Sequence, residues 1–166
     1  MKFLTNEEAR TRAARTLGAN GHPVLPIPGC ELRREVFEKE PGYTYFARAR
    51  EIVSSLDYFD WCLLWVVLTE VWPSNENLHL YYRLRESYGN RDQVGDQPGL
   101  VALHHEEVDL VTFVHLGMMF GWEMYLVTSH DYGRAFISRD GYFELSSNTP
   151  STNGAKGYER TDRPAT

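Results

Sequence analysis

Residues 99–131 constrain the fold of this chain more than any other stretch. A short apolar run at 100–103 is followed by a polar cluster at 104–107, a helix-length apolar segment ending at Phe120, and a second apolar run at 123–129. Short apolar runs are typical of buried strands, and the longer segment between them favours a helix. The stretch therefore predicts a strand, a helix and a strand, with polar residues at both strand ends.

Four other segments have clear patterns. Residues 61–72 are apolar without two-residue alternation, which predicts a strand covered on both faces and stopped by Pro73. Helical spacing of apolar residues predicts helices at 43–56 and at 74–89. Residues 134–147 predict a β-hairpin, because an Asp-Gly pair separates two strand-like runs.

The first forty residues are less regular. Thr5 and Glu8 have the spacing of a capping box, which predicts the start of a short helix. Prolines and glycines in residues 18–30 predict an extended connector. The charged segment 31–40 fits a frayed helix or a loop, and the sequence does not decide between them.

Read in order, these elements predict an α/β or α+β fold. We expect a mixed sheet of about five strands in the order β-α-β-α-β-β, with helices packed on it and two helices before it. The first three strands should run parallel through right-handed crossovers, with the hairpin antiparallel at an edge. Residues 1–147 then form one domain, in which 1–42 supply a helix and connector and 43–147 the core. Residues 148–166 predict a disordered tail.

Composition narrows the function classes. At 166 residues, with 42% hydrophobic and 13% aromatic residues, the chain suits one packed domain. A net charge of −6 disfavours nucleic acid and anionic membranes and favours a basic protein partner, and a homo-oligomer is left open. No apolar run is long enough for a signal peptide or membrane span, so we expect a cytoplasmic protein. Cys30 and Cys62 lack a paired-thiol motif and are expected to be reduced, with a disulfide between them as the alternative.

Polar residues follow all three strands that are predicted to be parallel. Because carboxyl ends of parallel strands share one edge of a sheet, these residues should converge there. They are Glu70, Trp72, His104, His105, Glu106, His130, Asp131 and Arg134. Strand ends are also polar wherever they enter loops, so convergence alone does not establish a site.

No strong cofactor motif is present. His105, Glu106 and Asp109 resemble a zinc-binding HExxH pattern in which Asp replaces the second His, but acidic residues also suit the first turn of any helix. His115 lies deeper in the same segment and is expected to be a core histidine. Nucleotide-binding glycine loops and a Gly-x-Ser-x-Gly elbow are missing. We therefore expect neither a metal nor a cofactor.

Aromatic residues suggest a second kind of site. Arg85 lies among tyrosines on its predicted helix, and we expect it to extend to solvent; the functional alternative is capture of an anion or carboxylate. Tyrosines and Trp72 could also form a contact surface, although filling of the core explains them equally well. This set comprises Tyr81, Tyr82, Tyr88, Tyr125, Tyr132 and Tyr142.

Two function classes remain. The first is a non-catalytic protein-binding module with an acidic, aromatic-rich surface, as antitoxin and immunity proteins have. Its candidate binding residues are Glu70, Trp72, Tyr81, Arg85, Tyr88, His104, Tyr132 and Arg134. The second is a small hydrolase, with or without a metal, in which His105, Glu106, His130 and Asp131 are catalytic. The lack of a strong catalytic motif puts the binding module first.

Overall fold

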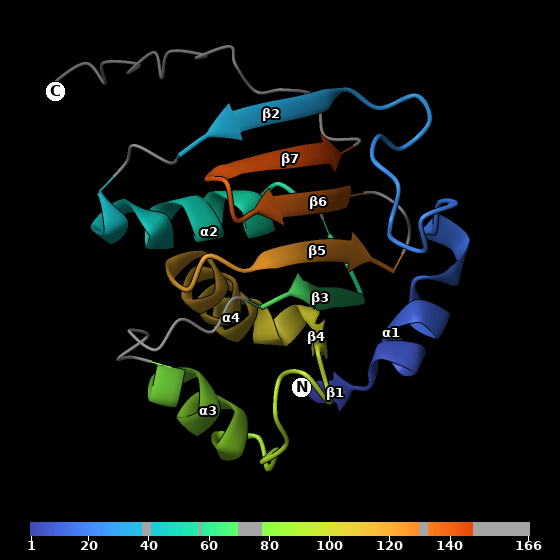
Figure 1. Ribbon diagram of the computed structural model, residues 1–166. Helices are drawn as coiled ribbons and strands as arrows, with labels where there is room; N and C mark the ends of the chain where they lie inside the picture. The colour runs from blue at the N-terminus through green and yellow to red at the C-terminus, as the bar shows by residue number, and fades with distance from the viewer. Residues whose placement is uncertain (38–40, 57, 70–77, 130–132, 148–166) are drawn as a thin grey trace, which may run out of the picture.

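A computed structural model describes residues 1–37, 41–56, 58–69, 78–129 and 133–147. Within these ranges the strands form one seven-stranded sheet in the order β1-β4-β3-β5-β6-β7-β2, and all neighbours are antiparallel (Figure 1). The strands are β1 (Lys2–Leu4), β2 (Leu32–Val36), β3 (Trp61–Leu68), β4 (Gly99–Leu103), β5 (Glu123–Thr128), β6 (Gly133–Ser138) and β7 (Tyr142–Ser147). The α-helices are α1 (Asn6–Arg12), α2 (Tyr45–Ser54), α3 (Leu78–Ser87) and α4 (Glu107–Met119), with 3₁₀ turns η1 (Ala14–Thr16), η2 (Gly42–Thr44) and η3 (His104–Glu106).

Helices cover the two faces of the sheet unequally. In Figure 1, α2 and α4 lie behind the sheet, and their apolar sides form the main core with the inward residues of the strands. On the front face, α1 packs on β3 and β4 and closes a smaller core around Leu63, Trp65 and Val127. No described helix lies over β6, β7 or β2 on that front face (Figure 1).

Burial of β3 on both faces explains its sequence. Leu63 and Trp65 belong to the core under α1, whereas Cys62, Leu64 and Val66 belong to the core under α2 and α4. A strand with two buried faces needs apolar side chains at odd and even positions alike. The strand predicted at 61–72 is confirmed, and it ends at Leu68.

The predicted parallel arrangement of the first three strands is wrong. β3 is antiparallel to β4 and to β5, with Trp61 opposite Leu103 and Cys62 opposite Thr128. β4 and β5 therefore run in the same direction on either side of β3, and α4 connects them as a crossover. The strand, helix and strand predicted at residues 99–131 are thus present, but a reversed strand lies between the two strands.

α3 lies between β3 and β4 in the sequence and packs through its aromatic and basic side chains. Tyr81 of α3 lies edge-on to Phe113 of α4 and to Trp122, and Arg85 of α3 lies over Phe3 of β1. β3 and β4 are antiparallel neighbours, so the chain direction reverses between them.

Other predictions are confirmed with shorter bounds. The Thr5–Glu8 capping box is present, and the predicted helices correspond to α1, α2 and α3. The hairpin is β6–β7, and Gly141 takes φ 76° in its turn. β1 and β2 were not predicted, and they raise the expected five strands to seven. The predicted tail at 148–166 lies outside the described residues, and none of the described helices could cross a bilayer.

Candidate functional site

The last residues of β4 and β5 lie at the same end of the strands, beside the first residue of β3. Ser129 donates its backbone N–H to the carbonyl of Trp61, and Leu103 is paired with the same residue. The last residue of β3, Leu68, lies at the opposite end of the strands, where it is paired with Glu123, the first residue of β5. The convergence predicted for three strand ends is therefore wrong for β3, because that strand runs the other way.

Five of the predicted site residues cannot be placed. Glu70, Trp72, His130, Asp131 and Tyr132 lie outside the described residues. Within the described part of the chain, no three His, Cys, Asp or Glu side chains are grouped so that they could hold a metal ion. The catalytic and binding roles predicted for these five residues stay predictions.

His104 follows β4 and packs against aromatic rings. Its ring centroid lies 4.6 Å from that of Tyr58 and 5.6 Å from that of Phe59. Phe59 is buried, so the imidazole covers the edge of the main core. His105, the next residue in η3, contributes a favourable charge interaction to the Glu106 carboxylate.

Glu106 is the last residue of η3, and its carboxylate caps this turn. One carboxylate oxygen accepts a 2.8 Å hydrogen bond from the backbone N–H of Leu103, and the other binds the amino group of Met1. Burial acts to raise the pKa of Glu106, but these two contacts and His105 outweigh it and lower the pKa. Both oxygens are occupied, so the carboxylate holds η3 and β1 together.

Arg85 is inside the molecule, and the prediction that it extends to solvent is wrong. Only 1% of its surface is exposed, and its guanidinium lies 4.4 Å from the ring centroid of Phe3. Nε donates to Asn90 Oδ1 at 2.9 Å, and Nη1 donates to the carbonyl oxygen of Gln97 at 3.1 Å. Through these hydrogen bonds, Arg85 links α3 to the loop that follows it.

Tyr81 and Tyr88 flank Arg85, as the helical spacing predicts. Tyr81 is buried, and its hydroxyl accepts a 3.4 Å hydrogen bond from Arg85 Nη1. Burial, the hydrogen bond to Asp109 and the negative charges of Asp109 and Glu106 raise the pKa of Tyr88 to about 12. The three predicted binding residues thus come together, but they join α3 to α4 and β1 instead of lining an open pocket.

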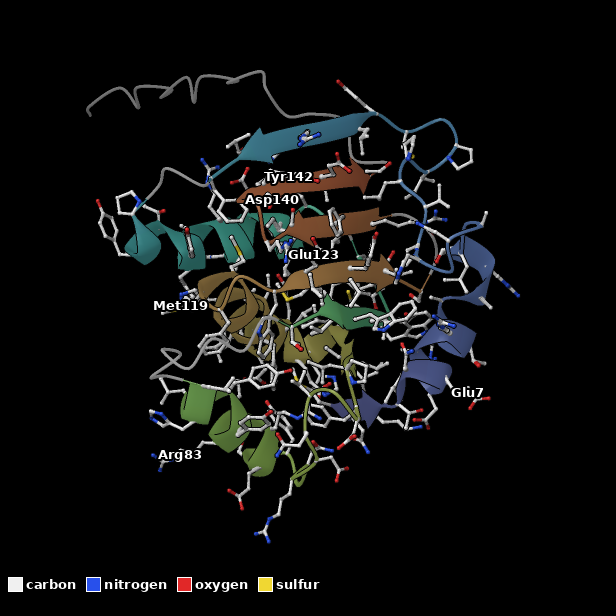
Figure 2. All side chains as sticks on the ribbon, in the orientation of Figure 1. Glu7, Arg83, Met119, Glu123, Asp140 and Tyr142 are labelled. Atoms are coloured by element: carbon white, nitrogen blue, oxygen red, sulfur yellow. The ribbon has the colours of Figure 1, made fainter. Side chains whose placement is uncertain are left out.

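The front face of the outer strands carries a row of partly exposed aromatic residues. Tyr125 of β5, Phe136 of β6 and Tyr142 of β7 form a row, with ring centroids 4.8 Å and 6.1 Å apart. β2 extends the row through side chains that alternate toward the front. We define the outer face as Glu123, Tyr125, Phe136, Tyr142, Glu144, Leu32, Arg34 and Val36; Figure 2 labels Glu123 and Tyr142 at one end of it.

Charged groups on the outer face are paired with each other. The guanidinium of Arg34 lies 3.8 Å from the ring centroid of Tyr142 and 3.5 Å from Glu144. Glu123 lies 4.0 Å from Arg139. Val36 is 63% exposed, so apolar side chains reach the edge of this face. The outer face therefore combines aromatic rings, apolar groups and partly neutralised charges.

Arg134 lies beside the outer face without being accessible. It is 6% exposed, and Nη1 donates a 2.8 Å hydrogen bond to the carbonyl oxygen of Val24 in the connector. A hollow next to it is lined by Val24, Tyr125, Phe136 and Glu144. Arg134 thus fixes the connector that borders the outer face, whereas its predicted role was direct binding.

Alternation in the hairpin is the sequence signal for this face. Ala135 and Ile137 are in the main core, and Phe136 between them points the other way. The same alternation separates Phe143 and Leu145 from Tyr142 and Glu144. Tyr125 and Tyr142 were candidates for a contact surface, but Phe136, Arg34 and the whole of β2 were missed.

The two cysteines should differ in reactivity. Neither cysteine forms a disulfide; Cys62 is fully buried in β3, and burial raises the pKa of its thiol. Cys30 lies in the partly exposed connector. Because the thiolate is the reactive form, we expect Ellman's reagent to modify one thiol per native chain and the second only after unfolding. Rapid reaction of both thiols in the native protein would contradict the burial of β3.

Comparison with known proteins yields no match. No family model, no curated protein sequence and no solved structure is significantly similar to this chain. A functional assignment therefore has to come from its own residues.

Proposed function

We propose that this chain is a non-catalytic protein-binding module whose contact surface is the outer face. The observation that carries the proposal is the row of Tyr125, Phe136 and Tyr142, which runs from β5 onto β6 and β7, where no described helix lies on the front face. Aromatic residues provide large contact areas at a low cost in side-chain entropy.

The composition of the outer face supports this role. Protein interfaces are enriched in tyrosine, phenylalanine and arginine, and their strongest contacts cluster at the centre of the patch. Here Phe136 lies between the two tyrosines, and Arg34 and Glu144 lie beside Tyr142. A partner that covers the rings would displace water from apolar surface and leave the paired charges near the rim.

The partner that we propose is a protein with a basic surface. The chain carries a net charge of −6, and this charge would speed its encounter with a basic protein and repel acidic ones. Small acidic proteins of the antitoxin or immunity type bind basic partners in this way. The charge sets the rate of encounter, whereas the aromatic rings would provide most of the affinity.

Site-specific photo-crosslinking tests the proposal in cells. A photoreactive phenylalanine at position 142 should crosslink the chain to its partner protein and give one adduct of defined mass. The matched control is position 43, because Tyr43 is 84% exposed on the helical side and should give none. Tyr142 is the less exposed of the two, so simple accessibility predicts the opposite ranking. Equal adducts at both positions, or none at position 142, would contradict the proposal.

A further inference from the structure

We infer that β2 pairs with β2 of a second copy of this chain, antiparallel and centred on Arg34, so that two sheets become one. This inference concerns the edge of the sheet and is independent of the proposed partner of the outer face. It follows from the free side of β2 and from the order of its side chains.

β2 has one unpaired side in the described structure. It is the last strand of the sheet, and its neighbour β7 pairs with it from Leu32 opposite Ser146 to Val36 opposite Tyr142. The backbone N–H of Phe37 donates to the carbonyl oxygen of Gly141, so Phe37 faces β7. Because backbone groups alternate along an antiparallel strand, Leu32, Arg34 and Val36 direct their N–H and C=O groups away from β7.

The sequence of β2 complements itself around Arg34. In an antiparallel pair centred there, Leu32 lies opposite Val36 of the second copy, and Arg33 lies opposite Glu35 of the second copy. Two apolar pairs and two ion pairs result. The backbone groups that face outward, those of 32, 34 and 36, then meet in register and can form hydrogen bonds.

The neighbouring registers are less favourable. Centring the pair on Glu35 places two carboxylates opposite each other, and centring it on Arg33 places two guanidinium groups opposite each other and Leu32 opposite Arg34. In the register that we infer, Arg34 is the only residue of β2 that lies opposite the same residue of the second copy. Arg34 already lies over Tyr142 and beside Glu144, which offsets that repulsion. The charges of β2 therefore select one partner strand and one register.

This pairing has a consequence for the outer face. The two-fold axis of an antiparallel strand pair is perpendicular to the sheet, so the front faces of the two copies lie on the same side. The two rows of aromatic residues then form one continuous surface across the dimer. The paired edge also leaves β2 without exposed backbone groups, which an edge strand would otherwise present for aggregation.

Two substitutions at Arg34 should change dimerisation in opposite directions. Proline removes an outward N–H without removing a hydrogen bond to β7, and it should raise the dimer dissociation constant of the full chain about tenfold or more. Threonine keeps the N–H and removes the repulsion between the two Arg34 side chains, and it should lower the constant about threefold. Sedimentation equilibrium measures both. A chain that is monomeric up to millimolar concentration, or a dimer that Arg34→Pro does not weaken, would overturn the inference.

A crosslink tests the register even if the proline variant folds poorly. In a Cys30→Ser background, Arg34→Cys should form a disulfide-linked dimer, because opposite residues in such a pair are about 5.5 Å apart at Cα. Arg33→Cys is the matched control and should stay monomeric under the same oxidation, because Arg33 faces Glu35 and not its own copy. Equal crosslinking of both variants, or of the control alone, would overturn the register.

Discussion

Replacing Arg85 with alanine should lower the free energy of unfolding by about 4 kcal/mol. The substitution leaves Asn90 Oδ1 and the Gln97 carbonyl without their donor and opens a cavity beside Phe3. An isolated surface arginine would cost almost nothing. Urea denaturation followed by tryptophan fluorescence measures the difference, provided that the dependence on urea concentration is unchanged.

Two variants on the same helix serve as controls. Arg83 is exposed on α3, and Figure 2 shows it pointing away from the protein, so Arg83→Ala should change stability by less than about 0.5 kcal/mol. Arg85→Lys should recover only part of the loss, because lysine cannot present the planar group of donors that Asn90 and Gln97 accept. An Arg85→Ala variant as stable as wild type would mean that the guanidinium does not hold α3. That result would instead favour the alternative role of Arg85, which is capture of an anion or carboxylate.

Gly133→Ala should cost about 3 kcal/mol. Gly133 begins β6 where this strand passes the end of α2, and a Cβ there would lie 2.5 Å from the carbonyl oxygen of Leu56 and 2.8 Å from its Cα. Both atoms are backbone, so neither can rotate away. Either β6 or the end of α2 must shift, which also disturbs the hydrogen bond from Gly133 to Thr128 Oγ1. Thermal unfolding should show a lower melting temperature.

Gly95→Ala is the matched control for this substitution. A Cβ at Gly95 would have no heavy atom within 4 Å, so the melting temperature should stay within a few degrees of wild type. Equal effects of the two substitutions would show that loss of glycine flexibility, and not the contact with Leu56, is responsible.

The regular elements could be predicted from the sequence because each carries its own periodicity or capping residues. The unbroken apolar residues of β3 indicated burial on both faces, and Asp140 and Gly141 indicated the hairpin. Strand direction carries no such local signal. Whether a strand runs parallel or antiparallel to its neighbour is decided by its pairing with strands far away in the sequence, here β4 and β5.

β1 and β2 escaped prediction for different reasons. β1 has three residues and is stabilised by its pairing with β4. The charged residues of β2 look typical of a loop in the sequence. The strand tolerates them because Arg33 and Glu35 form ion pairs with each other and with residues of α2. In both strands the pairing comes from residues far away in the sequence, and propensity alone does not reveal it.

The candidate site was predictable in its residue types more than in its location. The sequence singled out Tyr125 and Tyr142 as possible contact residues but could not separate them from Tyr81, which is in the core. All three are aromatic residues in regular elements. Which tyrosines are accessible depends on how far α1 and the connector extend over the sheet. The connector reaches β6 and β7 through Val24 and Ile27, whereas no described helix lies over β6 or β7 on the front face.

Complementation of a deletion strain tests the proposed binding role most directly. A Phe136→Ala, Tyr142→Ala double variant alters the outer face, and a His105→Ala, His130→Ala double variant removes two residues of the predicted catalytic set. With melting temperatures matched, we predict that the outer-face variant fails to restore the phenotype and that the histidine variant restores it fully. A histidine variant that fails while the outer-face variant succeeds would contradict a protein-binding function and favour catalysis.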